Sequence, residues 1–287
     1  MTTLPLISIF SYKSWGSEPV LLAADSGETP GRVWVAVSGT LLALGLDGTP
    51  QVRKVFLFNI RFLATASESV IVAGEEKGLE VLSLSGETRV AHQYAVTALC
   101  ADDETFAFCA KDHPSEVYLH GVSSQMIDKV LTLDEAVSGI ALRDTRLATA
   151  LPASNQVAVW DISEAEPRRL YNIPVGPSVE KLSFGLQPEE FFVWRGDDQV
   201  LVRYSRENWK ATIPAHHCFL NRHAIFYGKQ GEECTLEWIN GSCPTQGLPG
   251  PVISGIATPG WIAVAADRGI ELFDIIERSP FTDCTVS

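Results

Sequence analysis

The sequence predicts an all-β fold, a seven-bladed β-propeller in which each blade is a four-stranded antiparallel sheet. The first observation is a strand-like run at 156–161, in which apolar and β-branched residues alternate before a turn. The second is that similar runs recur roughly every 40 residues, the repeat length of a propeller blade. The third is a more apolar run just upstream of each one. A six-bladed ring is the alternative, if the weak sixth repeat merges with a neighbour.

Three strands of each blade can be placed from these patterns. The third strands are expected at 41–47, 79–85, 116–120, 156–161, 199–204, 234–239 and 269–274. The second strands are continuously apolar, which suits a position covered on both faces by neighbouring blades; they are expected at 32–37, 69–73, 105–110, 146–150, 191–194, 223–227 and 261–265. The innermost strands carry small residues suited to a crowded axis, such as Ala98, Gly139 and Gly255, and are expected at 20–24, 60–64, 96–100, 137–141, 179–184, 217–220 and 252–257.

The outer strands carry polar or charged residues, which discourage pairing at a sheet edge. They are expected at 52–56, 88–92, 129–133, 168–173, 209–213 and, weakly, 242–247. The seventh repeat lacks an outer strand, while the N-terminal run 6–10 lacks a blade, so we expect this run to complete the last blade and close the ring. A frayed N-terminal strand beside an incomplete blade is the alternative. The chain is then one domain, 1–287, with blades at 16–58, 59–94, 95–135, 136–176, 177–214, 215–250 and 251–276 plus 4–11.

Composition narrows the function classes. The 287 residues carry a formal net charge of −13 and have a pI of about 4.9, and an acidic surface repels nucleic acid and anionic lipid. No apolar run reaches the roughly 20 residues of a membrane helix, and the N-terminus lacks the features of a signal peptide. The six cysteines form no C-x-x-C pair, and Cys100 and Cys109 lie in apolar runs. We therefore expect reduced thiols and a cytoplasmic location.

The strand ending in Val159, Trp160 and Asp161 matches the terminal dipeptide of WD repeats, and 236–238 and 272–274 are relaxed versions of it. On these residues the chain resembles the WD-repeat family of β-propellers over nearly its whole length. Two features of the family are missing, since no Gly-His dipeptide begins a blade and only Asp144 with Trp160 could supply part of the family's His–Ser–Asp–Trp hydrogen-bond network. The resemblance implies a propeller that binds other proteins.

No catalytic, cofactor or metal site is predicted. The sequence contains no sialidase box, no quinoprotein repeat, no phosphate-binding glycine motif and no set of converging carboxylates for calcium. Zinc-type ligands occur at His216, His217, Cys218 and His223, but adjacent strand residues point to opposite faces, which disfavours a shared metal. A hydrolase or lactonase with an axial metal is the first alternative. A phosphoinositide-binding or membrane-binding propeller is the second; its Arg168–Arg169 pair follows two glutamates and is interpreted as a solvated strand.

What remains is a binding surface on loops held by rigid strands. In a propeller, the loops joining second to third strands and fourth to next-first strands gather on one face. We therefore predict a protein-binding rim of Tyr94, Lys111, His113, Asn155, Arg195, Asp197, His216, Lys229 and Arg268. The predicted function is a non-catalytic protein–protein interaction scaffold, a subunit of a hetero-oligomeric assembly. Among the tryptophans, Trp15 and Trp209 are possible contact anchors, while the others fill space between blades, namely Trp34, Trp160, Trp194, Trp238 and Trp261.

Overall fold

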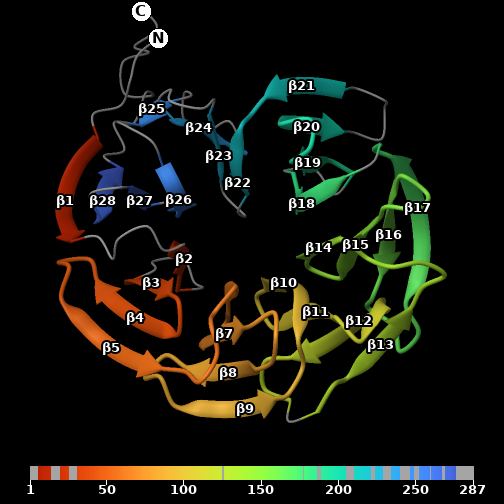
Figure 1. Ribbon diagram of the computed structural model, residues 1–287, viewed down its shortest axis with the longest axis horizontal. Helices are drawn as coiled ribbons and strands as arrows, with labels where there is room; N and C mark the ends of the chain where they lie inside the picture. Colours follow the sequence, from red (N-terminus) through yellow and green to blue (C-terminus); the bar gives the residue numbers. More distant parts are fainter. Residues whose placement is uncertain are drawn as a thin grey trace, which may run out of the picture.

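The regular secondary structure is entirely β-strand in the part of the chain that the computed structural model describes (Figure 1). The described residues are 6–13, 20–25, 31–124, 126–176, 178–185, 189–204, 210–220, 224–228, 234–239, 246–248, 252–258, 260–266 and 269–275. Their strands form seven four-stranded antiparallel sheets arranged in a ring, which confirms the predicted seven-bladed propeller and excludes the six-bladed alternative. Within this part of the chain, no helix is long and apolar enough to span a membrane.

Each blade uses four strands, and in the first six blades these are consecutive. Blade 1 contains β2 (Val20–Ala24), β3 (Arg32–Val37), β4 (Thr40–Gly45) and β5 (Pro50–Val55). Blade 2 contains β6 (Phe62–Ala66), β7 (Ser69–Ala73), β8 (Leu79–Ser83) and β9 (Thr88–His92). Blade 3 contains β10 (Val96–Asp102), β11 (Thr105–Ala110), β12 (His113–Gly121) and β13 (Lys129–Thr132). Blade 4 contains β14 (Gly139–Arg143), β15 (Arg146–Leu151), β16 (Gln156–Asp161) and β17 (Arg168–Pro174).

The remaining blades follow the same plan until the ring closes. Blade 5 contains β18 (Val179–Phe184), β19 (Phe191–Arg195), β20 (Val200–Tyr204) and β21 (Lys210–Pro214). Blade 6 contains β22 (His217–Leu220), β23 (Ala224–Gly228), β24 (Cys234–Trp238) and β25 (Gln246–Leu248). Blade 7 contains β26 (Val252–Ala257), β27 (Trp261–Ala266), β28 (Gly269–Ile275) and, as its outer strand, β1 (Leu6–Lys13).

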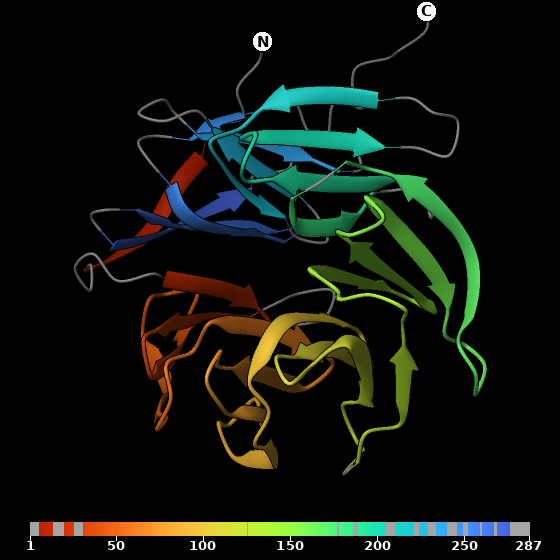
Figure 2. The same ribbon diagram turned by 45° about the vertical axis from the view of Figure 1, so that its right-hand side comes forward.

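The N-terminal strand β1 closes the ring, as predicted. It pairs antiparallel with β28, from Leu6 opposite Ile275 to Lys13 opposite Gly269, with an irregularity between Ser8 and Phe10. Figure 2 shows β1 in red beside the blue strands of blade 7, the two ends of the chain's regular structure lying side by side. Because an unpaired β28 would expose a row of backbone N–H and C=O groups, this pairing removes an open edge at the seam.

The hydrophobic core is divided among the spaces between neighbouring blades. Seven clusters of buried apolar side chains are present, and each draws on two adjacent sheets. The cluster between blades 1 and 2, for example, joins Trp34 and Leu41 to Val70 and Leu82. The second strand β7 is buried along its whole length, while outer strand β5 is largely exposed. The five strand tryptophans pack in these clusters, as predicted; Trp15 and Trp209 lie outside the described residues.

Two inner strands begin two residues later than predicted. Strand β6 begins at Phe62 rather than residue 60, and β14 begins at Gly139 rather than residue 137. Ile60 and Val137 are buried but precede the strands: the Ile60 N–H donates to Ser38 O in the β3–β4 turn, and the Val137 N–H donates to Pro114 O near the start of β12. A buried apolar residue in a connection lengthens the apolar run in the sequence, which explains the error.

Candidate functional site: the loop rim

One face of the propeller carries the loops predicted to bind a partner, here called the rim. It comprises the loops between second and third strands and the connections from each outer strand to the next blade. Backbone hydrogen bonds tie the two kinds of loop together: Lys111 N donates to Ala95 O at 2.8 Å, Val175 N to Asn155 O at 2.9 Å, and Ala215 N to Gln199 O at 2.7 Å. The rim is therefore anchored by main-chain contacts, which leave its side chains available.

The predicted rim residues fall into three groups. Lys111, His113, Asn155 and Asp197 are exposed. Arg195, His216 and Tyr94 are half-buried. Lys229 and Arg268 lie outside the described residues. His113 was expected in a loop but is the first residue of β12. Strand pairing resumes directly after the turn at 111–112, with Ala110 opposite His113.

Tyr94 has a packing role that the sequence did not indicate. Its ring centroid lies 5.2 Å from that of Phe108 and 5.3 Å from that of Tyr118, in the cluster between blades 2 and 3. His92 and His120 adjoin the same group of rings, with their Nε2 atoms 3.4 Å apart. Since aromatic pairs at such distances contribute to stability, Tyr94 joins two blades and presents little surface to a partner.

Acidic groups dominate the rim. Arg195 Nη2 pairs with a carboxylate oxygen of Asp198 at 2.5 Å, and Asp197 accepts a hydrogen bond from the Ser178 hydroxyl. Hydrogen bonds from Ser154 and then Ala153 lower the pKa of Glu135, which therefore stays ionised. The rim carboxylates outnumber the bases Arg61, Lys77, Lys111 and Arg195 in the described loops; they are Glu75, Glu76, Asp112, Asp134, Glu135, Asp197 and Asp198.

The histidine–cysteine run does not converge on a metal. Cys218 is fully buried in the cluster between blades 5 and 6, while His217 lies on the other face of β22, with its ring centroid 6.1 Å from that of Phe219. Burial lowers the pKa of His217 and raises that of the Cys218 thiol to about 12. No group of three or more His, Cys, Asp or Glu side chains suited to a metal ion occurs among the described residues; His223 lies outside them.

Lys181 on inner strand β18 is a charged residue near the axis that sequence reasoning missed. Its Nζ donates to Cys218 O at 2.6 Å and lies 5.0 Å from the ring centroid of Trp194 and 4.8 Å from that of Phe219. Desolvation lowers its pKa. Carbonyl and ring contacts of this kind stabilise a partly buried cation, so Lys181 joins blades 5 and 6. The signal was present in the sequence, as a pair of charges, Glu180 and Lys181, inside an innermost strand.

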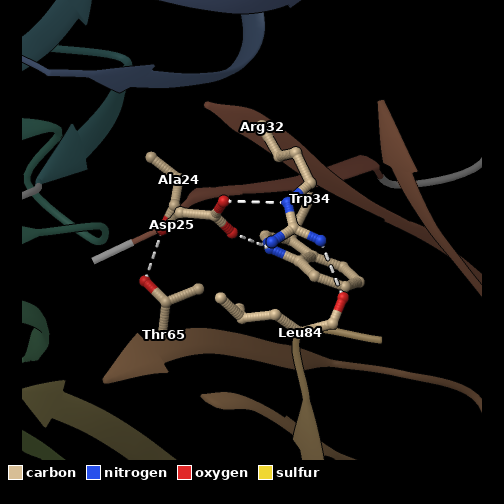
Figure 3. Close-up of polar contacts among 6 residues, drawn as sticks. All are labelled: Ala24, Asp25, Arg32, Trp34, Thr65 and Leu84. Atoms are coloured by element: carbon tan, nitrogen blue, oxygen red, sulfur yellow. Dashed lines mark hydrogen bonds and ion pairs between the residues drawn. The ribbon is translucent and has the colours of Figure 1, made fainter. Parts of the chain in front are cut away.

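A partly buried polar network joins blades 1 and 2 (Figure 3). The Asp25 carboxylate accepts hydrogen bonds from Trp34 Nε1 at 2.5 Å and from Arg32 Nε at 3.0 Å. Arg32 Nη1 continues to Leu84 O in blade 2 at 2.8 Å, and the Thr65 hydroxyl of blade 2 donates to Ala24 O at 2.6 Å. These groups lie on the opposite face from the rim, and they satisfy one another, so the network holds the two blades together.

Asp144 and Trp160, which could have supplied part of the family's hydrogen-bond network, each bond to another residue. Trp160 Nε1 donates to the Thr149 hydroxyl on the neighbouring strand β15, at 3.1 Å. Asp144 lies in the turn between β14 and β15, where its backbone N–H donates to the Asp102 carboxylate. Strand pairing explains the difference, because β15 places the fully buried Thr149 beside the indole.

Leu57 is the most exposed large apolar residue in the described part of the rim, and it was not predicted. It lies in the connection from β5 to β6, with its side chain fully exposed. The signal available in the sequence was the run Phe56, Leu57, Phe58 directly after a charged outer strand. Periodicity cannot tell which of three consecutive apolar residues in a loop faces solvent.

Comparison with known proteins identifies the fold. No protein-family model matches the chain, and no curated protein matches it by sequence. Solved structures do match; among them is the Neurospora crassa Pan2 WD40 domain, with a TM-score of 0.71 at 12% sequence identity, over 97% of this chain and 98% of that one. At this identity the likeness concerns the fold alone. Together with the seven closed blades, it makes the chain a WD-repeat-like β-propeller in fold.

Proposed function

We propose that the protein is a non-catalytic protein-interaction scaffold, a subunit of a larger hetero-oligomeric assembly, and that it docks a protein or peptide through its rim. One observation carries the proposal. Rim loops are fixed to one another by main-chain hydrogen bonds, while side chains such as Lys111, His113 and Asn155 remain exposed. Rigid strands that present exposed polar side chains on loops are a usual basis for binding.

The electrostatics of the rim support a partner with a basic surface. Acidic residues predominate in its described loops, and the whole chain has a net charge of −13. Complementary charge accelerates encounter and disfavours acidic partners, nucleic acid included. We also propose a reducing compartment, the cytoplasm, since Cys109, Cys218 and Cys234 are buried free thiols.

Affinity capture with matched variants tests the proposal. The full-length chain, an Asp112→Lys, Asn155→Ala rim variant and a Glu87→Lys variant of the opposite face would each be used to capture proteins from native cells. We expect the rim variant to lose at least one protein that wild type retains, while the opposite-face variant keeps it. Equal capture by all three folded proteins, or capture of nothing by wild type, would show that the rim is not the docking surface.

A further inference from the structure

Two large apolar side chains are exposed within three residues of each other at the edge of the rim. They lie in what we call the knob loop, residues 55–61, which comprises the last residue of β5 and its connection to β6. Leu57 is 101% exposed and Val55 67% exposed. Met126 and Val130, the other large apolar side chains found exposed in the described part of the chain, lie away from the rim, on the connection from β12 to β13 and on β13 itself.

The knob loop is held firmly, although its tip is exposed. Phe56 N donates to Gly39 O at 2.7 Å, and Ile60 N donates to Ser38 O at 2.6 Å, so both ends of the tip are bonded to the β3–β4 turn of blade 1. The Phe56 and Ile60 side chains are buried between blades 1 and 2. A fully exposed leucine on such a fixed loop needs little ordering when a partner binds.

Phe58 adds a third constraint, on the side of blade 2. Its ring occupies the space above two glycines of the neighbouring rim loop, where a Cβ added to Gly74 would lie 2.9 Å from the ring and one added to Gly78 would lie 2.4 Å from it. Gly78 also has φ +94°, a conformation that side chains rarely adopt. Because both glycines lack a side chain, the Phe58 ring packs closely against their loop. Leu57 is therefore exposed on a loop that is held in place.

We propose that Leu57 is a docking knob that enters an apolar recess on a different protein, whose surface around that recess is basic. This inference rests on the proposed function and adds the contact point and the chemistry of the partner. An exposed apolar side chain at a fixed position is the kind of anchor that dominates interfaces when it fills a pocket. Burial of Val55 beside it extends the apolar contact.

The charges of the whole rim decide between possible partners. The adjacent rim loop exposes Glu75, Glu76 and Lys77, and Arg61 Nε lies 3.9 Å from a carboxylate oxygen of Glu75, so acidic and basic groups balance beside the knob. The rest of the described rim is predominantly acidic. A second copy of this chain would bring the same acidic rim against itself, and like charges at an interface are unfavourable. A basic face on another protein complements the rim.

Site-specific photo-cross-linking tests the knob directly. A benzoyl-phenylalanine residue would replace Leu57 in the full-length chain in native cells, and Met126 in a control chain. We expect Leu57 to cross-link a protein that Met126 does not, and the cross-linked segment to combine apolar residues with Lys or Arg. Cross-links no more abundant at Leu57 than at Met126, a cross-link to a second copy, or one to an acidic segment would overturn the inference.

A substitution separates this inference from the proposed function. Leu57→Ser should weaken binding of the cross-linked protein by tenfold or more, whereas Met126→Ser should leave it unchanged; both changes are at exposed sites and should leave the melting temperature unaltered. If the Asp112→Lys, Asn155→Ala variant loses its partner while Leu57→Ser keeps it, the rim docks the partner without the knob. In that case the knob inference is wrong and the proposed function stands.

Discussion

At the scale of single residues, stability depends on a few buried polar groups whose partners come from other strands. Asp25 is one of these, because its carboxylate accepts from both the fully buried Trp34 indole and the Arg32 guanidinium. Arg32 then reaches a carbonyl of the next blade, at Leu84. Removing an acceptor from a buried donor costs more than the hydrogen bond itself contributes.

Asp25→Ala should therefore lower the free energy of unfolding by about 2–3 kcal/mol, since it leaves a buried N–H and a guanidinium without their acceptor. Urea denaturation monitored by tryptophan fluorescence would measure the change. The matched control is Asp112→Ala at an exposed rim position, for which we expect a change within about 0.5 kcal/mol. Equal effects of the two substitutions would contradict the structural role of Asp25.

The histidine pair between blades 2 and 3 makes stability depend on pH. His120 is fully buried, stacks on Phe106 and lies within 2.7 Å of Gly121 O through Nδ1. If Nδ1 carries the proton, His120 Nε2 is left to accept from His92 Nε2–H at 3.4 Å. Desolvation first, and the neighbouring His120 second, lower the pKa of His92 below its usual value of 6.5.

A lowered histidine pKa means that the unfolded chain binds protons at a pH where the folded chain does not. The contribution of His92 to the free energy of unfolding is therefore complete above pH 6.5 and is lost as the pH falls through the folded-state pKa. We expect the free energy of unfolding to decline on acidification below pH 6.5, and His92→Gln to reduce the slope of that decline. Denaturation curves measured from pH 8 to pH 5 test this, and an unchanged slope in the variant would assign the effect to other groups, such as His217.

At the scale of elements, the ring depends on one strand from the other end of the chain. Strand β1 supplies the outer edge of blade 7 and pairs with β28 over nearly its whole length. The other six blades are built from consecutive strands. Closure thus brings together residues at the two ends of the described chain, and it depends on this single pair of strands.

Deletion of residues 1–13 should open the seam and expose the β28 edge. We expect the melting temperature to fall by roughly 10 °C or more, equivalent to several kcal/mol for a chain of this size, together with concentration-dependent association through the free edge. Calorimetry and size-exclusion chromatography would measure both effects. Adding a synthetic peptide of residues 1–13 should partly restore the melting temperature; a truncated chain as stable and monomeric as wild type would show that closure is dispensable.

At the scale of the whole molecule, the core belongs to the interfaces between blades and not to any single blade. Each of the seven apolar clusters uses two neighbouring sheets. A blade that loses its neighbour therefore loses one of the two apolar interfaces that bury it. This sharing around a closed ring favours cooperative unfolding over separate melting of the blades.

Substitutions in distant clusters should therefore shift the same transition. Phe108→Ala, between blades 2 and 3, and Phe226→Ala, between blades 6 and 7, remove fully buried rings and should each cost about 3–5 kcal/mol. Differential scanning calorimetry should show one peak in both variants, at a lower temperature than in wild type. A second peak in either variant would mean that the two regions unfold independently.

Much of the architecture could be predicted because it is encoded locally. Alternation in the third strands, continuous apolar runs in the second strands and polar outer strands each reflect which faces a strand buries. The errors occurred at Ile60 and Val137, which are buried but do not belong to a strand. The predicted rim residues that the structure describes share a face because the order of strands places their loops there, and Tyr94 among them also packs between blades.

The sequence by itself determined the β class and predicted seven blades closed by the N-terminal strand, since periodicity and repeat spacing are local properties; the structure excluded the six-bladed and frayed-strand alternatives. Only the tertiary structure decided which loop side chains are free. Leu57 is exposed because Phe56 and Ile60 take the buried positions around it and Phe58 packs against blade 2. Lys181 is not free, because a carbonyl oxygen and two aromatic rings from blades 5 and 6 contact its ammonium group. Such contacts join residues far apart in the chain, and no local pattern records them.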